Sequence, residues 1–197
     1  MYLSCSTLCF SLDAYPDIRE VLAEIRRLGF PAVDVAVFEG WQNVDPSSLV
    51  VGNDGWVEDF LKGLAETELT VSSFNCGFSR QIDDPAADAF ALIRREFEAV
   101  LDLALKVDCP NLTVQPGRSI EGHAYASLFH TAQVRLAELG ALAQAQGVAL
   151  SVEGHQGSLL ENPADAVRMM EALWPTAGFT YDPSHWTMQA IPLPETE

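Results

Sequence analysis

Two short segments of the sequence each combine a carboxylate with a histidine. Glu153 and His155 are separated by one residue, and Asp182 and His185 are separated by two. Glu153 closes the largely apolar run 149–152, where a buried carboxylate is costly unless it is paired or holds a metal. Two carboxylates and two imidazoles make an oxygen and nitrogen donor set that suits Mn²⁺, Mg²⁺, Co²⁺ or Zn²⁺. The alternative is that both histidines simply hydrogen-bond loop carbonyls.

Polar residues also end other apolar segments of strand length. Asn75 and Gln115 each follow such a segment, as Glu153 and Asp182 do. In parallel α/β sheets the carboxyl ends of the strands form the ligand-binding face, so we expect all four side chains to line one cavity. For Asn75 and Gln115, the alternative that they cap helices or satisfy turns carries more weight. For Glu153 and Asp182, the shared site is favoured.

Short apolar segments alternate with longer segments of helical period, which is the pattern of repeated βα units around a parallel sheet. The expected strands cover residues 2–7, 32–38, 70–75, 111–115, 148–153 and 179–182. The expected helices cover residues 16–28, 56–68, 85–105, 125–146 and 163–173. Asp84-Pro85 and Asn162-Pro163 each place a capping side chain before a first-turn proline. A loop is expected after the last strand.

The spacing of these strands predicts the fold. Their starts recur at about 35 residues, which is what one βα unit consumes, so a barrel of eight units would need about 280 residues. We therefore predict an α/β fold of the TIM (β/α)₈ type in one domain over residues 1–197, with about six units present and the last two missing. The open sheet edges would favour association into a homo-oligomer. A doubly wound open sheet is the alternative, although no glycine-rich phosphate loop follows any strand.

The amino-acid composition limits the kinds of partner that we expect the protein to bind. The 11 basic and 28 acidic residues give a formal net charge of −17, which repels a phosphate backbone and excludes nucleic acid as an expected partner. No apolar run approaches the roughly 20 residues of a membrane helix, so no membrane contact is expected. The four cysteines are scattered and are expected to be reduced. Because no secretory signal follows Met1, we expect a cytoplasmic protein.

The order of several short motifs resembles a known family. The motifs are Gly29-Phe30 through Val33-Asp34-Val35, Ser73-Phe74-Asn75, Val114-Gln115-Pro116-Gly117, Ser151-Val152-Glu153-Gly154-His155 and Tyr181-Asp182-Pro183-Ser184-His185. They stand at successive strand ends over nearly the whole chain. In this arrangement the sequence resembles the xylose isomerase-like barrels of the sugar phosphate isomerase/epimerase superfamily, which also includes metal-dependent AP endonucleases.

The resemblance implies a set of site residues. Such barrels hold a divalent metal with a Glu of the fifth strand and an Asp of the sixth, which Glu153 and Asp182 match. The family's histidine three residues after the Asp, matched by His185, approaches substrate or a metal-bound water, and His155 matches a histidine of some branches. The family's other two ligands come from the seventh and eighth strands and have no counterpart in these 197 residues. Metal binding by this chain alone is therefore expected to be weak.

The function that the resemblance implies is a metal-dependent isomerase or epimerase. It would act on a small sugar or related polyhydroxy carbonyl compound through an enediolate, once the C-terminal strands are supplied. Glu153 would be metal ligand and acid/base, Asp182 a second ligand, and His185 a catalytic residue that orients a substrate oxygen. The expected substrate-binding residues are His155, Gln115, Asn75 and Trp186.

Several alternatives to this function remain. A sugar or inosose dehydratase would use the same metal site, and a noncatalytic truncated barrel would serve as an assembly component. An AP endonuclease is disfavoured by the net charge of −17. Trp186, Trp41 and Phe78 lie just beyond expected strand ends and could form an apolar surface against the sugar. Aromatic residues in such loops serve equally often only to pack against neighbouring side chains.

Overall fold

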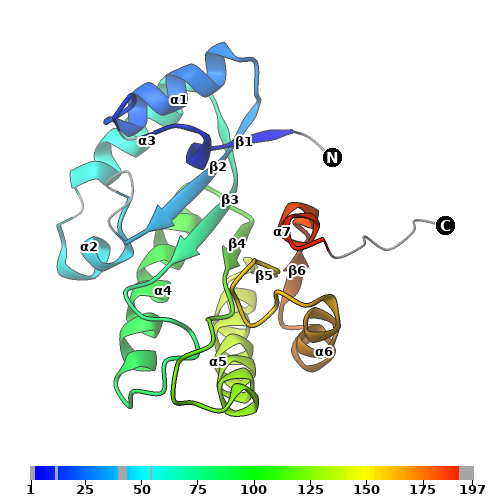
Figure 1. The fold of residues 1–197 in the computed structure, drawn as a ribbon. Helices are drawn as coiled ribbons and strands as arrows, with labels where there is room; N and C mark the ends of the chain where they lie inside the picture. The colour runs from blue at the N-terminus through cyan, green and yellow to red at the C-terminus, as the bar shows by residue number, and fades with distance from the viewer. Residues whose placement is uncertain (1–2, 12, 40–43, 54, 191–197) are drawn as a thin grey trace. The chain divides into compact units, whose positions relative to one another are not determined.

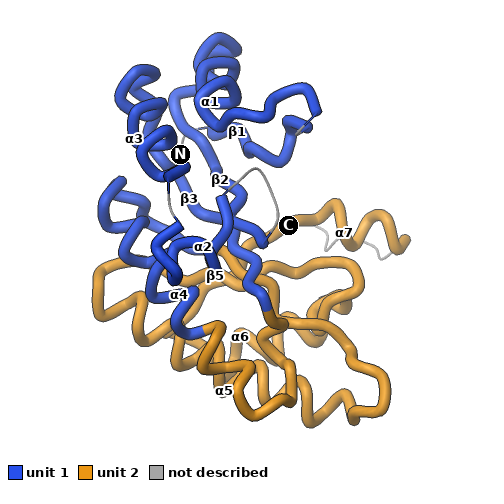
Figure 2. The backbone as a smooth tube through the Cα atoms, turned by 90° about the vertical axis from the view of Figure 1, so that its left-hand side faces the viewer, with its two compact units in different colours: residues 1–79, 94–112 blue, residues 80–93, 113–197 orange. Residues whose placement is uncertain are grey.

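The computed structural model describes residues 3–11, 13–39, 44–53 and 55–190 of the chain. Helices and strands alternate along it (Figure 1), which confirms the α/β class. The chain divides into two compact units (Figure 2). Unit 1 comprises Met1–Ser79 and Arg94–Leu112, and unit 2 comprises Arg80–Ile93 and Thr113–Glu197. Within the described residues, no helix combines the length and apolar character needed to span a membrane.

Unit 1 is built on parallel strands. Strand β1 (Ser4–Ser6) pairs with β2 (Ala32–Phe38), and β2 pairs with β3 (Thr70–Gly77), both in parallel. Of the seven residues of β2, five are buried, as expected for a central parallel strand covered on both faces. The next strand along, β4 (Asn111–Val114), neighbours β3 in the sheet and crosses into unit 2 after Leu112.

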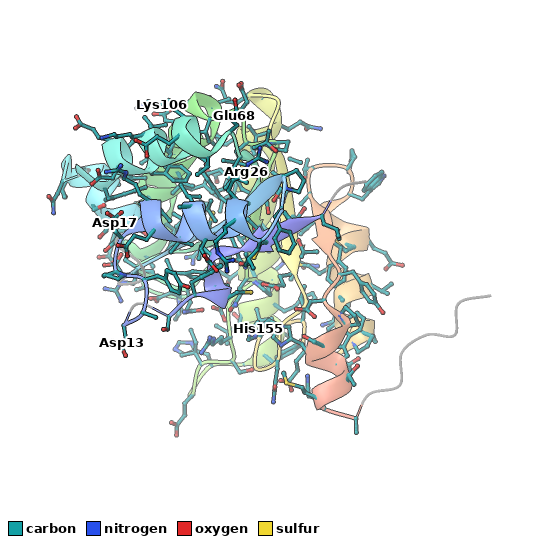
Figure 3. The ribbon with its side chains drawn as sticks, turned by 90° about the horizontal axis from the view of Figure 1, so that it is seen from above. Asp13, Asp17, Arg26, Glu68, Lys106 and His155 are labelled. Carbon is teal, nitrogen blue, oxygen red and sulfur yellow. The ribbon has the colours of Figure 1, made fainter. Side chains whose placement is uncertain are left out.

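Two helices of unit 1 pack against each other: α1 (Ile18–Arg27) and α3 (Gly55–Thr67). Helix α1 is amphipathic, and its apolar side chains at helical spacing are buried. Asp17 caps its N-terminus by accepting a hydrogen bond from the backbone N–H of Arg19 (2.8 Å), while Arg26 in its last turn lies 3.9 Å from Glu68 (Figure 3). A 3₁₀ turn, η1 (Thr7–Cys9), and a short helix, α2 (Pro46–Val51), complete the unit's N-terminal half.

Unit 2 continues the same alternation and carries the candidate site. After β4 come α5 (Tyr125–Ala145), β5 (Ala149–Glu153), α6 (Pro163–Leu173), β6 (Gly178–Thr180) and α7 (Pro183–Met188). In the sheet β5 lies between β4 and β6, and it pairs with β6 in parallel, with Val152 opposite Phe179 and Glu153 opposite Thr180. Because both strands run in the same direction, the residues that come after them emerge at the same edge. All six strands expected from the sequence are present.

The structure corrects the expected element boundaries in two places. Helix α4 (Ala89–Lys106) begins four residues after Pro85, because the Asp84 carboxylate accepts the N–H of Ala86 (2.9 Å) within a turn instead of capping the helix. The segment after β6 is the helix α7 and not a loop. The first residues of the expected strand 2–7 lie outside the described part of the chain, and β1 covers Ser4–Ser6.

Candidate metal centre

Glu153 is the last residue of β5 and is buried, with only 8% of its surface exposed. Glu153 stands at the carboxyl end of β5, after Leu150 and Val152, which are both buried. Its partner on β6 is Thr180, two residues before Asp182. The parallel register therefore brings the two acidic residues to neighbouring strand ends, as expected from the sequence.

Asp182 has two structural tasks. It is the N-cap of α7, where its Oδ1 accepts the backbone N–H of Ser184 (2.8 Å) and Pro183 occupies the first helical position. Its other oxygen, Oδ2, lies 3.6 Å from Nε2 of His185. The helical turn brings His185 back over Asp182, since residues three apart on a helix lie on the same side.

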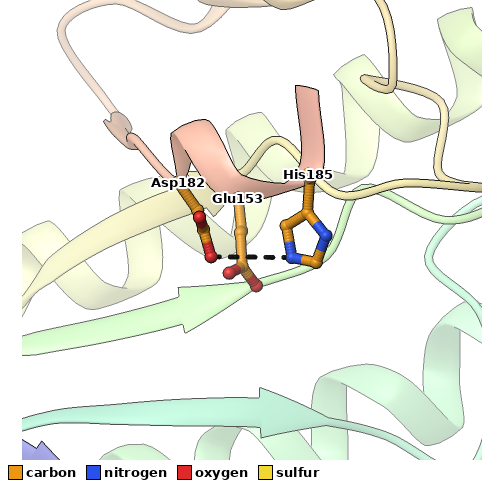
Figure 4. A group of neighbouring side chains, drawn as sticks. All are labelled: Glu153, Asp182 and His185. Atoms are coloured by element: carbon orange, nitrogen blue, oxygen red, sulfur yellow. Dashed lines mark ion pairs between the residues drawn. The ribbon is translucent and has the colours of Figure 1, made fainter. Parts of the chain in front are cut away.

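Glu153, Asp182 and His185 form one cluster (Figure 4). Each offers a ligand atom, and these three atoms all lie within 4.8 Å of one another. Ligand atoms that share one divalent ion lie about 2.0–2.6 Å from it, so two of them are separated by at most about 5 Å. The spacing of the cluster therefore fits a single metal ion. The sequence predicts the two carboxylates as ligands and includes His185 in the possible donor set, and the imidazole of His185 lies in the same group. Their roles as metal ligands stay predictions.

The electrostatics of the cluster suit a cation. Burial acts to raise the pKa of Asp182, but hydrogen bonds from Ser184 and the imidazoles of His185 and His155 outweigh it and lower that pKa below its ordinary value. Burial and the neighbouring His155 lower the pKa of His185, against the opposing effect of Asp182. At neutral pH this gives an ionised carboxylate and a neutral imidazole, the protonation states that metal binding requires.

His155 lies against His185. The centroids of their rings are 3.8 Å apart, and the ring planes are inclined by 42°. Nδ1 of His155 lies 2.6 Å from the carbonyl oxygen of Gln156, and because a carbonyl oxygen can only accept, Nδ1 carries a proton and donates it. The carbonyl contact expected as an alternative for His155 is therefore present. His185 differs, because its Nδ1 is buried and has no hydrogen-bond partner among the described residues.

Trp186 lies beside the cluster but is buried, with 5% of its surface exposed. Its ring stacks on Phe179 (centroids 6.1 Å apart) and meets the edge of Tyr181 at 5.5 Å. Gly154, directly after Glu153, lies so close to this group that an added Cβ would stand 2.9 Å from Phe179 Cζ and 3.4 Å from Trp186 Cζ2. The aromatic packing therefore fixes the backbone next to Glu153, and the role of Trp186 in substrate binding stays a prediction.

We expect Gly154→Ala to destabilise the protein by about 1–3 kcal/mol, because the methyl group forces Phe179 or the strand end to move. Gly178→Ala is the matched control, since a Cβ there meets nothing closer than Ser151 Oγ at 3.7 Å. Urea unfolding of both variants measures the difference. Equal midpoints for the two variants would contradict the close packing of Gly154.

The other predicted site residues lie at different places in the chain. Gln115 is half-buried and directly follows β4 in unit 2, whereas Asn75 lies on β3 in unit 1. Oδ1 of Asn75 is buried without a hydrogen-bond partner in the described part of the chain. Phe78 packs on Phe97 in unit 1, and Trp41 lies outside the described residues. The substrate-binding roles of Gln115 and Asn75 stay predictions.

Sequence reasoning missed the helix that positions His185, although a signal for it exists. Asp182-Pro183 repeats the pattern of Asn162-Pro163, a capping side chain before a first-turn proline, and Asn162 does cap α6. The same reasoning applied to Asp182 predicts a helix that begins at Pro183. All four cysteines are free, as expected.

Comparison with known proteins places this geometry in a family. The family model described as xylose isomerase-like TIM barrel matches residues 22–196. No curated protein matches the sequence. Among solved structures, the apo 3-keto-D-glucoside 4-epimerase of E. coli is similar with a TM-score of 0.74 and 16% identity, over 96% of this chain and 71% of the epimerase chain.

Two further structures share the fold. A xylose isomerase-like TIM barrel protein of Mycobacterium smegmatis, solved in complex with magnesium, has a TM-score of 0.71 and 20% identity, over 93% of this chain and 65% of that protein. The probable 3-DHS dehydratase of Bacillus anthracis has a TM-score of 0.71 and 12% identity, over 96% of this chain and 66% of the dehydratase. These 197 residues thus span about two thirds of the length of such relatives. The sequence match and the fold together show that the chain belongs to the xylose isomerase-like TIM barrel family.

Proposed function

We propose that the protein is a metal-dependent isomerase or epimerase that acts on a small sugar or a related polyhydroxy carbonyl compound. The observation that carries this proposal is the cluster of Glu153, Asp182 and His185, whose ligand atoms lie within 4.8 Å of one another. The similarity to a sugar epimerase and to a magnesium-bound barrel of the same family supports it. The chain covers about two thirds of the length of such relatives. The substrate and the activity of the whole protein are therefore proposed here.

The donor set fits a divalent cation, with Glu153, Asp182 and His185 as the residues that would hold it. Such a cation would stabilise negative charge that develops on the substrate's oxygen atoms. Glu153 would also remove the proton from the carbon next to the carbonyl group; an isomerase would return this proton to the neighbouring carbon, whereas an epimerase would need a second acid on the opposite face of the substrate. His155, held by the hydrogen bond from its Nδ1 to the carbonyl oxygen of Gln156, would orient a substrate hydroxyl group beside His185 through its other ring nitrogen.

A dehydratase is the second candidate, supported by the fold shared with the probable 3-DHS dehydratase. Both reactions begin when a carboxylate removes a proton next to a carbonyl group. They differ in the second step, because the dehydratase expels a hydroxide from the neighbouring carbon, whereas the isomerase or epimerase puts a proton back on carbon. The product therefore separates the two candidates.

The test is incubation of the protein with a panel of ketoses and keto-glycosides in D₂O, with Mn²⁺ or with a chelator. An isomerase or epimerase is expected to exchange deuterium into the carbon next to the carbonyl group in the presence of Mn²⁺ only, which NMR detects. A dehydratase is expected to yield products that have lost one water, which mass spectrometry detects. Neither exchange nor dehydration across the panel, with Mn²⁺ bound, would contradict the proposal.

A further inference from the structure

A second carboxylate in unit 2 is buried but lies outside the metal cluster. Asp83, in the segment between β3 and α4, has no exposed surface. Its Oδ1 accepts the backbone N–H of Arg118 at 3.2 Å, while its Oδ2 is buried without a hydrogen-bond partner in the part of the chain that the structure describes. A carboxylate so placed is costly, so its presence calls for a physical reason.

The reason lies in the loop that comes after Gln115. Gly117 adopts a φ of +102°, and the position of a Cβ on it is occupied by the carboxylate of Asp83. Only glycine fits this contact, since any side chain would collide with Asp83 and would also disfavour the positive φ. The backbone of residues 116–118 is thus shaped directly on the Asp83 carboxylate.

The same loop holds the segment that carries His155. The carbonyl oxygen of Gly117 accepts the N–H of Leu159 at 3.1 Å, and the carbonyl oxygen of His155 accepts the N–H of Ser158 at 3.1 Å. One backbone hydrogen bond therefore connects Gly117, which lies on Asp83, with the segment 155–159, and the second closes the turn that begins at His155. This turn places His155 against His185, with the centroids of the two rings 3.8 Å apart.

Side chains of α5 hold both ends of this connection. Nη1 of Arg135 donates to the carbonyl oxygens of Ile82 and Asp84, both at 2.7 Å, and so fixes the backbone on either side of Asp83. The hydroxyl of Tyr125 lies 2.8 Å from the carbonyl oxygen of Leu159 and also 2.8 Å from Oδ2 of Asp165, and its single proton is shared between these two acceptors. With both ends fixed on one helix, the contact of Asp83 with Gly117 and Arg118 determines how the loop between them lies.

We propose that Asp83 is a positioning residue for the metal centre: its buried carboxylate shapes residues 116–118, which hold the 155–159 turn and thereby keep the ring of His155 against that of His185. The structural part of this proposal concerns unit 2 alone. Its consequence for catalysis rests on the proposed function. Desolvation raises the pKa of Asp83, and the N–H of Arg118 opposes that rise, which agrees with a carboxyl group kept for its shape and its acceptor oxygen.

The test uses the imidazole resonances of the metal-free protein. The sequence has four histidines, and those of His155 and His185 are identified by their loss in His155→Gln and His185→Gln. Each of the two rings feels the ring current of its neighbour, so these resonances report the contact between the rings directly. We expect Asp83→Ala to shift both, while His123 and His130 stay in place. Asp83→Asn keeps the shape and the acceptor oxygen of the side chain, so its His155 and His185 resonances are expected at the wild-type positions.

Two further variants make the test decisive. Asp88→Ala removes an exposed carboxylate from the same segment and is expected to shift none of the four resonances. Gly117→Ala places a methyl group against the Asp83 carboxylate and so disturbs the same contact. It is expected to shift the His155 and His185 resonances as Asp83→Ala does. This variant keeps the test valid if Asp83→Ala fails to fold. Unchanged His155 and His185 resonances in Asp83→Ala or in Gly117→Ala, or equal shifts in Asp88→Ala, would overturn the proposal.

A second readout separates this proposal from the proposed function. In the D₂O assay with saturating Mn²⁺, Asp83→Ala is expected to lower the exchange rate by about 10²-fold, because small displacements of positioned groups have effects of that size. Its Mn²⁺ affinity is expected to stay near that of the wild type, since the three donors are untouched. If no variant, wild type included, shows exchange, the proposed function fails while the resonance shifts still decide the role of Asp83.

Discussion

Replacement of Glu153 by Gln is expected to lower the rate of metal-dependent proton exchange by at least about 10³-fold. The substitution keeps the size and shape of a side chain that is 8% exposed and removes its charge. That charge has two uses in the proposed site, since it attracts the cation and accepts the proton from the substrate carbon. The exchange rate in D₂O at saturating Mn²⁺, with Mn²⁺ affinity from calorimetry, measures both uses.

Glu171→Gln is the matched control for this variant. Glu171 is exposed on α6 in the same unit, so the substitution changes the net charge by the same amount without touching the cluster. The control is expected to retain the wild-type exchange rate and Mn²⁺ affinity. Wild-type exchange by Glu153→Gln with Mn²⁺ fully bound would remove Glu153 from both roles.

The sequence predicts the strands well because parallel strands carry an unambiguous local signal. Residues 32–38 are predicted as a strand from their apolar character, and β2 has those bounds. Burial on both faces makes such a run mostly apolar, with Asp34 as the one charged residue within it. The helix starts are harder to predict, as α4 shows, because Asp84 is equally suited to cap a helix or to close a turn. Contacts distant in sequence decide between the two.

The same limit applies to the site. Glu153 and Asp182 are predictable because each ends or follows a strand and parallel strands end at one edge. The part played by His185 depends on α7, since a helical turn returns a side chain over the residue three positions before it, whereas the expected loop leaves its direction open. The burial of Trp186 and the fit of Gly117 on Asp83 arise from segments far apart in the chain, and no local period encodes them.

Asp182 both caps α7 and offers a ligand atom, and this leads to a prediction whose size depends on metal. Asp182→Asn is expected to reduce Mn²⁺ affinity by at least about 10²-fold, because it replaces a charged ligand by a neutral amide. Asn is as good an N-cap as Asp, so α7 keeps its cap. In the metal-free protein, the lowered pKa of Asp182 means that its charge is stabilised by folding, so the variant is expected to be slightly less stable than the wild type.

With Mn²⁺ present, the difference in stability should grow. An ion at 100 times its dissociation constant stabilises the folded wild type by about 2.7 kcal/mol, and a variant that binds 10²-fold more weakly gains only about 0.4 kcal/mol. Urea unfolding with and without Mn²⁺ measures both differences.

Asp182→Ala separates the cap from the ligand. It is expected to bind Mn²⁺ as weakly as Asp182→Asn and to be about 1 kcal/mol less stable than Asp182→Asn under both conditions, because only the alanine leaves the N–H of Ser184 without its acceptor. Equal stabilities for the two variants would show that the cap contributes nothing to α7. An Mn²⁺-induced gain in stability as large in Asp182→Asn as in the wild type would show that the carboxylate of Asp182 is not a ligand, and that the 4.8 Å cluster serves only to begin the helix that carries His185.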